Sequence, residues 1–139
     1  MEFGTILLHD AFQFPDGEVS KKYLIVLNTP KIEENEVYAI AKTTSRQKRR
    51  DTQFGCSKNK LTFHIPAKQC FFPLDTWIIL NEIYLVEPNS LLADKMAGVC
   101  NIVGSLNENF KKYLIDCIRS SDDIEENILN LILTSYYRK

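Results

Sequence analysis

Up to about residue 87 the chain alternates short apolar runs with turn-forming residues. Runs that are rich in β-branched and aromatic residues and bounded by Gly, Pro, Asn or Asp predict strands, here at 4–8, 23–27, 37–41, 61–65 and 77–86. The second run is apolar on both faces, which predicts a central strand covered on each side. The last run is one long strand or two, with a bulge at Asn81 and Glu82. Pro15 and Gly17 predict a tight turn at 14–18.

Beyond Pro88 the apolar period changes from 2 to 3.6. Ser105 and Glu108 have the spacing of a capping box, so we expect a helix to begin at Ser105. A second helix follows Asp122, and its apolar residues between 124 and 133 are too numerous for one stripe. That surplus apolar surface requires a partner, which is the first helix, a second copy of the chain or a different protein.

Strands first and helices last predict an α+β fold in a single domain. A chain of 139 residues with 45% apolar residues has room for one modest core. We expect the strands to occupy about residues 1–87 and the helical part about residues 104–137.

Charge is distributed unevenly along the chain. The net charge is −1, yet the window from Lys42 to Lys60 carries +6 and the remainder −7. A concentrated positive segment is suited to a polyanion, although a solvated surface loop has the same composition.

The four cysteines, at 56, 70, 100 and 117, have no zinc-ligand spacing, so a metal site is not expected. Cys100 and Cys117 lie among apolar residues and are interpreted as small core side chains, as in a protein of a reducing compartment. The first residues are too short an apolar run for a signal peptide, and no uncharged run reaches transmembrane length. These features predict a cytoplasmic protein that does not enter a membrane.

The usual enzyme motifs are absent from the sequence, including the P-loop, Gly-x-Ser-x-Gly and the dinucleotide fingerprint. A two-histidine ribonuclease mechanism would require His9 and His64 to converge. His64 is interpreted as a half-exposed strand residue, whereas His9, at the end of the first strand, is harder to dismiss.

Six short segments stand in a recognisable order along the chain: GTILL, FQFPDG, KKYLIVLN, AKTTS, PLDTW and VGSL, which begin at residues 4, 12, 21, 41, 73 and 103. Their order resembles that of the MazF/PemK toxins of toxin–antitoxin systems, and the match is colinear from about Gly4 to Ile118.

The resemblance implies a small SH3-like β-barrel of about five to seven strands, followed by two C-terminal helices. It further implies a homodimer that cleaves single-stranded RNA through the RNA's 2′-hydroxyl, without a metal or cofactor, and that an antitoxin protein blocks by lying in the RNA groove. In the family an Arg-Pro pair at the start of the central strand carries the main catalytic role. This chain has Lys22-Tyr23 there, and lysine lacks the planar fork that grips a phosphate at two points.

On this basis we expect Lys22 and Arg46 to hold the scissile phosphate and Thr44 and Ser45 to orient it. RNA-binding residues are then expected among the remaining cations near the site, which are Lys21, Lys48, Arg49, Arg50, Lys58 and Lys60. Three groups of these site residues have a structural alternative. Residues 21–22 could be the charged start of a strand, residues 44–45 the caps of a turn, and residues 46–50 a solvated loop.

Two other functions fit the same sequence. A barrel that has lost its arginine can hold nucleic acid or a peptide without cutting it. A purely structural interaction protein would explain the apolar last helix but not the basic window. Phe54, Phe71 and Phe72 are candidates for stacking on unpaired bases, with core packing as the alternative for the last two.

Overall fold

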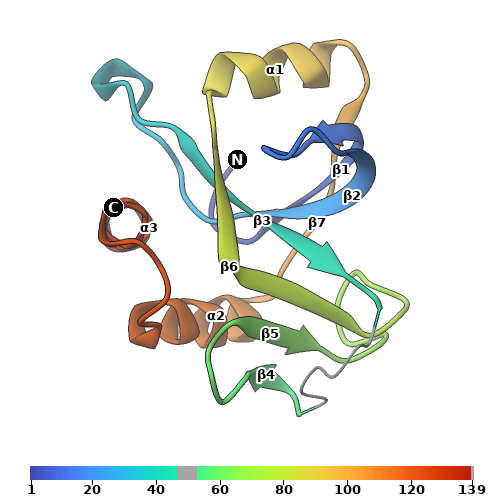
Figure 1. Cartoon of the computed structure of the whole chain (residues 1–139), viewed down its shortest axis with the longest axis vertical. Coiled ribbons are helices and arrows are strands. Elements are labelled where there is room, and N and C mark those ends of the chain that lie inside the picture. Colours follow the sequence, from blue (N-terminus) through green and yellow to red (C-terminus); the bar gives the residue numbers. More distant parts are fainter. Residues whose placement is uncertain (47–52, 139) are drawn as a thin grey trace.

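The computed structural model describes residues 1–46 and 53–138 and has an α+β fold (Figure 1). In these residues one antiparallel sheet has the strand order β4-β5-β6-β3-β2-β1-β7. Its strands are β1 (Thr5–Gln13), β2 (Val19–Val26), β3 (Tyr38–Thr44), β4 (Gly55–Cys56), β5 (Thr62–Ile65), β6 (Thr76–Val86) and β7 (Cys100–Ser105). The helices are α1 (Pro88–Met96), α2 (Glu108–Ser120) and α3 (Glu126–Tyr137), with a 3-10 turn at Ile32–Glu34.

The sheet is not closed into a barrel, which corrects the expectation of a closed barrel over residues 1–87. Among the described residues β4 and β7 are the two edges and have no ladder between them. Closure requires a continuous ladder, and β4, with two residues, is too short to supply one. The connection between β5 and β6 lies against β7 instead, because the Phe71 ring packs on Gly104 and Cys70 Sγ is 4.0 Å from Ser105 O.

Strand β6 is one continuous strand with an irregularity where a bulge was expected. Its pairing with β3 runs from Val86 to Ile83 and resumes only at Ile78, so residues 79–82 interrupt the register. Strand β6 turns at this point, and its first half joins β5 (Figure 1).

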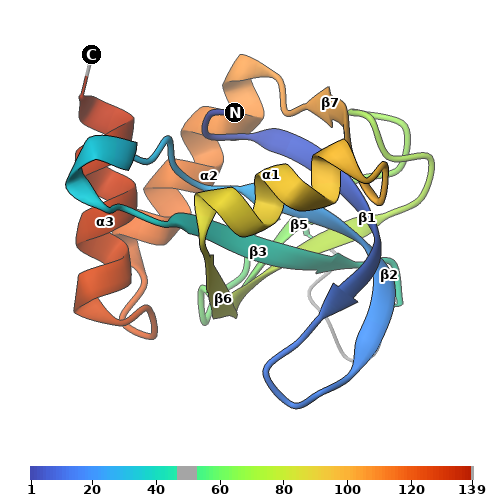
Figure 2. The same ribbon diagram turned by 90° about the horizontal axis from the view of Figure 1, so that it is seen from above.

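The core lies on both faces of the sheet, and β2 is an interior strand between β3 and β1, covered on both faces as predicted. Alternate β2 side chains face opposite ways: Ile25 belongs to the cluster under α2 and α3, whereas Leu24 and Val26 belong to the cluster under α1. All three are fully buried, and each such side chain stabilises the fold by about 1.5–3 kcal/mol. Figure 2 shows α1 lying across the strands and α2 with α3 at the side.

The expected helix start at Ser105 is wrong. Ser105 ends β7, and α2 begins at Glu108 with Asn107 as its N-cap, whose Oδ1 accepts a hydrogen bond from Phe110 N at 2.8 Å. The Asn107 side chain provides the N-cap acceptor that was expected from Ser105, two residues later in the chain. Leu106, between the end of β7 and this cap, is buried in the core. Strand β7 and helix α1 were not predicted, and β7 extends the sheet beyond the expected boundary at residue 87.

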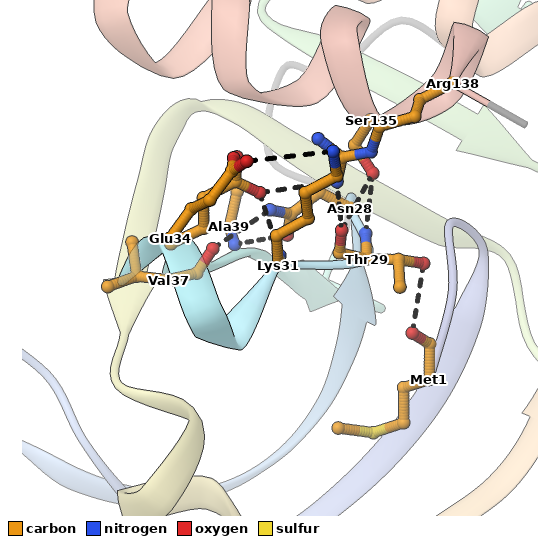
Figure 3. A network of polar contacts seen from close by, with 10 residues as sticks. Met1, Asn28, Thr29, Lys31, Glu34, Val37, Ala39, Ser135 and Arg138 are labelled. Atoms are coloured by element: carbon orange, nitrogen blue, oxygen red, sulfur yellow. Dashed lines mark hydrogen bonds and ion pairs between the residues drawn. The ribbon is translucent and has the colours of Figure 1, made fainter.

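The apolar surface of the last helix is covered in part by the rest of the chain. Ile124 and Ile132 are buried in the core cluster, and residues 128, 129, 131 and 133 pack partly against it. The end of α3 is also held by polar contacts (Figure 3): Thr29 N donates to Ser135 Oγ (2.8 Å) and Arg138 donates to Thr29 O (2.9 Å). The chain's own core, which includes α2, is therefore one of the three expected partners of this surface.

The interpretation of Cys117 as a free core thiol is wrong. It is buried as expected, but it forms a disulfide with Cys56 across a Cα–Cα distance of 5.6 Å, which joins β4 to α2. No spacing rule indicates this bond, because the two residues are 61 positions apart. Cys100 is a buried free cysteine, as predicted, and burial raises the pKa of its thiol.

Candidate functional site

The four expected catalytic residues line one pocket of about 230 Å³, here called the Thr44 pocket. Lys21 lines it as well. The complete lining is Lys21, Lys22, Tyr23, Thr43, Thr44, Ser45, Arg46, Phe72, Pro73, Leu74 and Thr76. Three cations and five hydroxyl groups therefore line a small cavity with one apolar wall.

Antiparallel pairing explains why residues 22 and 44 meet. Leu24 lies opposite Lys42 in the ladder between β2 and β3, and continuing that register by two residues places Lys22 beside Thr44. Strand β2 starts where β3 ends, so one end of the strand pair carries both segments. The segment that leads into β6 supplies the third wall, because Thr44 pairs with Trp77 on the other side.

The hydroxyl groups of this pocket have different roles. Thr43 is buried and donates to Tyr23 O at 2.8 Å, which fixes the two strands together. Thr44 Oγ1 accepts from Arg46 N at 3.2 Å, the turn-capping contact that was the structural alternative. A hydroxyl accepts and donates at the same time, so Thr44 can still donate to a ligand in the pocket.

The apolar wall is formed by the end of the connection between β5 and β6. Phe72 is buried and its ring lies 5.6 Å from that of Tyr23, in the core position that was the alternative for this residue. Leu74 is 62% exposed beside the cations. Phe54 packs on Phe110 of α2 at 5.3 Å between ring centroids and does not line the pocket.

The expected RNA-binding cations do not all gather at this pocket. Lys58 and Lys60 lie between β4 and β5, outside its lining, and Lys60 Nζ donates to Ser120 O at the end of α2 (3.1 Å). There its positive charge complements the helix dipole. The assignment of Lys58 and Lys60 to RNA stays a prediction. Lys48, Arg49 and Arg50 lie outside the described residues.

A second pocket, of about 410 Å³, shares Lys22 with the first and was missed by the sequence analysis. This Glu82 pocket is lined by Phe14, Pro15, Asp16, Glu18, Lys22, Lys42, Glu82, Ile83 and Tyr84. The bulge predicted at Asn81 and Glu82 was the only sequence signal for it, since a polar residue at a strand irregularity commonly faces a site.

An ion pair organises the Glu82 pocket. Lys42 Nζ is 2.7 Å from Glu82 Oε2, and the Tyr84 hydroxyl is 3.4 Å from the same oxygen. Burial acts to lower the pKa of Lys42, but the hydrogen bond to Glu82 and the neighbouring charges outweigh it, so that pKa is raised. Burial raises the pKa of the Tyr84 phenol. Lys42 therefore keeps its charge in this pocket.

The two histidines do not converge. His9, in β1, is buried, with Nε2 2.9 Å from Asp94 Oδ2 and Nδ1 accepting from Ala11 N. His64, in β5, is also buried rather than half-exposed, and it stacks on Trp77 at 4.8 Å. Strands β6, β3 and β2 separate them in the sheet, which excludes a shared two-histidine site.

The described ranges, 1–46 and 53–138, contain no group of three or more His, Cys, Asp or Glu residues that could hold a metal ion. Within the same ranges, none of the helices has the length and apolar character needed to cross a membrane. Neither a scan of models of known protein families nor a search of curated proteins found a match to the chain.

Proposed function

We propose that this protein is a MazF/PemK-like endoribonuclease that cleaves single-stranded RNA in the Thr44 pocket. One observation carries the proposal: Lys22, Thr44, Ser45 and Arg46, chosen from the sequence, line the same cavity. The cavity contains three cations and, among the described residues, no carboxylate, which favours a phosphate diester over a cationic or neutral ligand.

The reaction is attack of the RNA's 2′-oxygen on the adjacent phosphorus. A bond forms between the 2′-oxygen and phosphorus while the bond to the 5′-oxygen breaks, which leaves a 2′,3′-cyclic phosphate and a 5′-hydroxyl. Lys22 and Arg46 stabilise the charge that develops on the phosphoryl oxygens, and Thr44 and Ser45 donate hydrogen bonds that orient the group. The 5′-oxygen takes its proton from water, so that Lys22 acts only through its positive charge and its hydrogen bonds.

The acceptor of the 2′-hydroxyl proton is hydroxide or water in this proposal. The described lining has neither an imidazole nor a carboxylate that would serve as a general base. The cleavage rate should therefore rise with pH from 6 to 9 without the bell shape of a two-histidine enzyme.

The decisive experiment compares cleavage of a long single-stranded RNA by the wild type and three variants. Thr44→Ala and Arg46→Ala should lower the rate by orders of magnitude with unchanged thermal melting, because their role is at an exposed pocket. Lys22→Arg should raise it, since the planar guanidinium restores two parallel donors. Lys112→Ala removes an exposed charge from α2, outside both the pocket and the expected RNA-binding residues. It is the control and should cleave like the wild type.

A second candidate function, RNA binding without cleavage, is favoured by Lys22 at the family's arginine position and by the lack of a general base in the described lining. A wild type that binds RNA but does not cut it, together with a Lys22→Arg variant that does, would support this alternative. If neither protein cuts RNA, the nuclease proposal is rejected.

The proposal extends to the partners and the location of the protein. The proposed partners are a second copy of the chain and an antitoxin protein that occupies the RNA groove. The proposed location is the cytoplasm. The Cys56–Cys117 disulfide counts against a cytoplasmic location, because such bonds are rare in reducing compartments. Sedimentation of the full chain at micromolar concentration tests the dimer.

A further inference from the structure

We infer that the Glu82 pocket binds a guanine base of the same RNA whose phosphate lies in the Thr44 pocket. This inference rests on the proposed RNA function and adds the base that the site reads. The two pockets are neighbours that share one lining residue, Lys22. A nucleotide chain that places a phosphate on one side of Lys22 can therefore place a base on the other.

The charge of the Glu82 pocket favours a base over a phosphate. Its titratable carboxylates are Asp16, Glu18 and Glu82, against the cations Lys22 and Lys42. The net charge of −1 opposes a phosphate, whereas the neighbouring Thr44 pocket has three cations and no acid in its described lining. Carboxylates that face a nucleobase accept hydrogen bonds from its N–H groups.

The ion pair supplies a pattern of donors and acceptors that guanine alone completes. Glu82 offers two acceptor oxygens, and the Lys42 ammonium is a donor 2.7 Å from one of them. The Watson–Crick edge of guanine offers two donors, N2–H and N1–H, followed by the acceptor O6. Adenine, cytosine and uracil each present one donor group beside an acceptor, so they satisfy only two of the three groups.

Tyr84 and Phe14 lie beside the Lys42–Glu82 ion pair, and the Glu82 carboxylate stays accessible to a ligand. The Tyr84 hydroxyl is 3.4 Å from Glu82 Oε2, and Lys42 Nζ is 5.4 Å from the centroid of the buried Phe14 ring. Glu82 itself is 51% exposed at the side chain, so its carboxylate can reach a ligand, whereas Lys42 is 29% exposed. The half-buried Tyr84 ring adds an aromatic wall for the base.

Fluorescence anisotropy on labelled five-nucleotide RNAs tests this inference. The RNAs carry 2′-O-methyl groups, which prevent cleavage, and differ only in the central base: guanine, hypoxanthine, adenine, cytosine or uracil. Guanine should bind about tenfold or more tightly than the last three. Hypoxanthine lacks only the N2 amine and should be intermediate.

Glu82→Gln leaves one acceptor oxygen and should abolish the difference between guanine and hypoxanthine. Glu108→Gln removes the same charge from α2, at an exposed pair with Lys111, and should leave the preference intact. Equal binding of guanine and hypoxanthine by the wild type, or a preference that survives Glu82→Gln, overturns the inference. A failure of every RNA to bind overturns it too.

The outcomes separate this inference from the proposed nuclease. Guanine preference without cleavage of unmodified RNA rejects the nuclease and keeps the guanine pocket. Cleavage without base preference, or cleavage that follows another base, rejects the guanine pocket and keeps the nuclease.

Discussion

Breaking the Cys56–Cys117 disulfide should lower the free energy of unfolding by about 4 kcal/mol. The two cysteines are 61 residues apart, and the cross-link restricts the unfolded chain far more than the folded one. For a loop of this length the chain-entropy relation gives about 14 cal/mol/K, or about 4 kcal/mol at 25 °C. That is a large part of the stability of a typical domain.

Cys56→Ser isolates the cross-link from packing. Cys56 is exposed, so a serine there is solvated, and Cys117 stays in place as a buried thiol with 2% exposure. Strand β4 has only two pairs in its ladder, Gly55 with His64 and Cys56 with Phe63. The short edge strand should therefore be the first element to loosen when the bond is lost.

Urea unfolding followed by the fluorescence of Trp77, the single tryptophan, provides the assay. With an m-value of about 2 kcal/mol/M, a dithiol reductant should lower the wild-type midpoint by about 2 M. The reductant should have the same effect on Cys70→Ser, the control, and none on Cys56→Ser. Equal wild-type midpoints with and without reductant would show that the bond is not formed or does not stabilise the fold.

Three further predictions concern stability. Leu114→Ala should cost about 2–5 kcal/mol in urea unfolding, because this α2 side chain is fully buried in the core; a loss below 1 kcal/mol would contradict its core position. Asn107→Ala should cost about 1 kcal/mol by removing the N-cap bond of α2, whereas Asn107→Ser should retain most of the stability, and equal losses in both would count against capping. The hydrogen bond from Lys31 N, together with Arg138 and against the effect of burial, lowers the pKa of Glu36 from its ordinary value of 4.5. The ionised Glu36 carboxylate therefore contributes fully to the free energy of unfolding above pH 4.5, and this contribution is lost as the pH falls through the lowered pKa. In Glu36→Gln the free energy of unfolding should fall less steeply as the pH is lowered below 4.5. An unchanged fall would refute the prediction.

The elements with a strong local signal were predicted from the sequence. The apolar run at 23–27 lies in β2, an interior strand of the sheet. The Pro-Asp-Gly turn forms with Gly17 at φ +92° and Asp16 Oδ1 accepting from Glu18 N. These features depend on neighbours in the chain, so local pattern suffices to find them. Lys22 and Thr44 were chosen together from the resemblance to the toxin family, and the antiparallel pairing of β2 with β3 is what places them side by side.

The missed features depend on contacts between distant residues. Strand β7 has few apolar residues facing the core and joins the sheet by pairing with β1, about 95 positions away. Helix α1 buries only Leu91, so its sequence lacks a continuous apolar stripe. The Glu82 pocket and the disulfide likewise bring together residues whose proximity no local spacing encodes.

The pairing of β1 with β7 has a consequence for synthesis of the protein. His9 and Leu8 pair with Cys100 and Asn101 in the β1–β7 ladder. About 90 further residues must therefore be synthesised before the outer edge of β1 can pair. At about 5–20 residues per second a ribosome takes roughly 5–20 s over that stretch. During this interval the nascent chain exposes an unpaired, apolar strand edge, and chaperone binding at β1 is the expected safeguard against misassembly between neighbouring nascent chains.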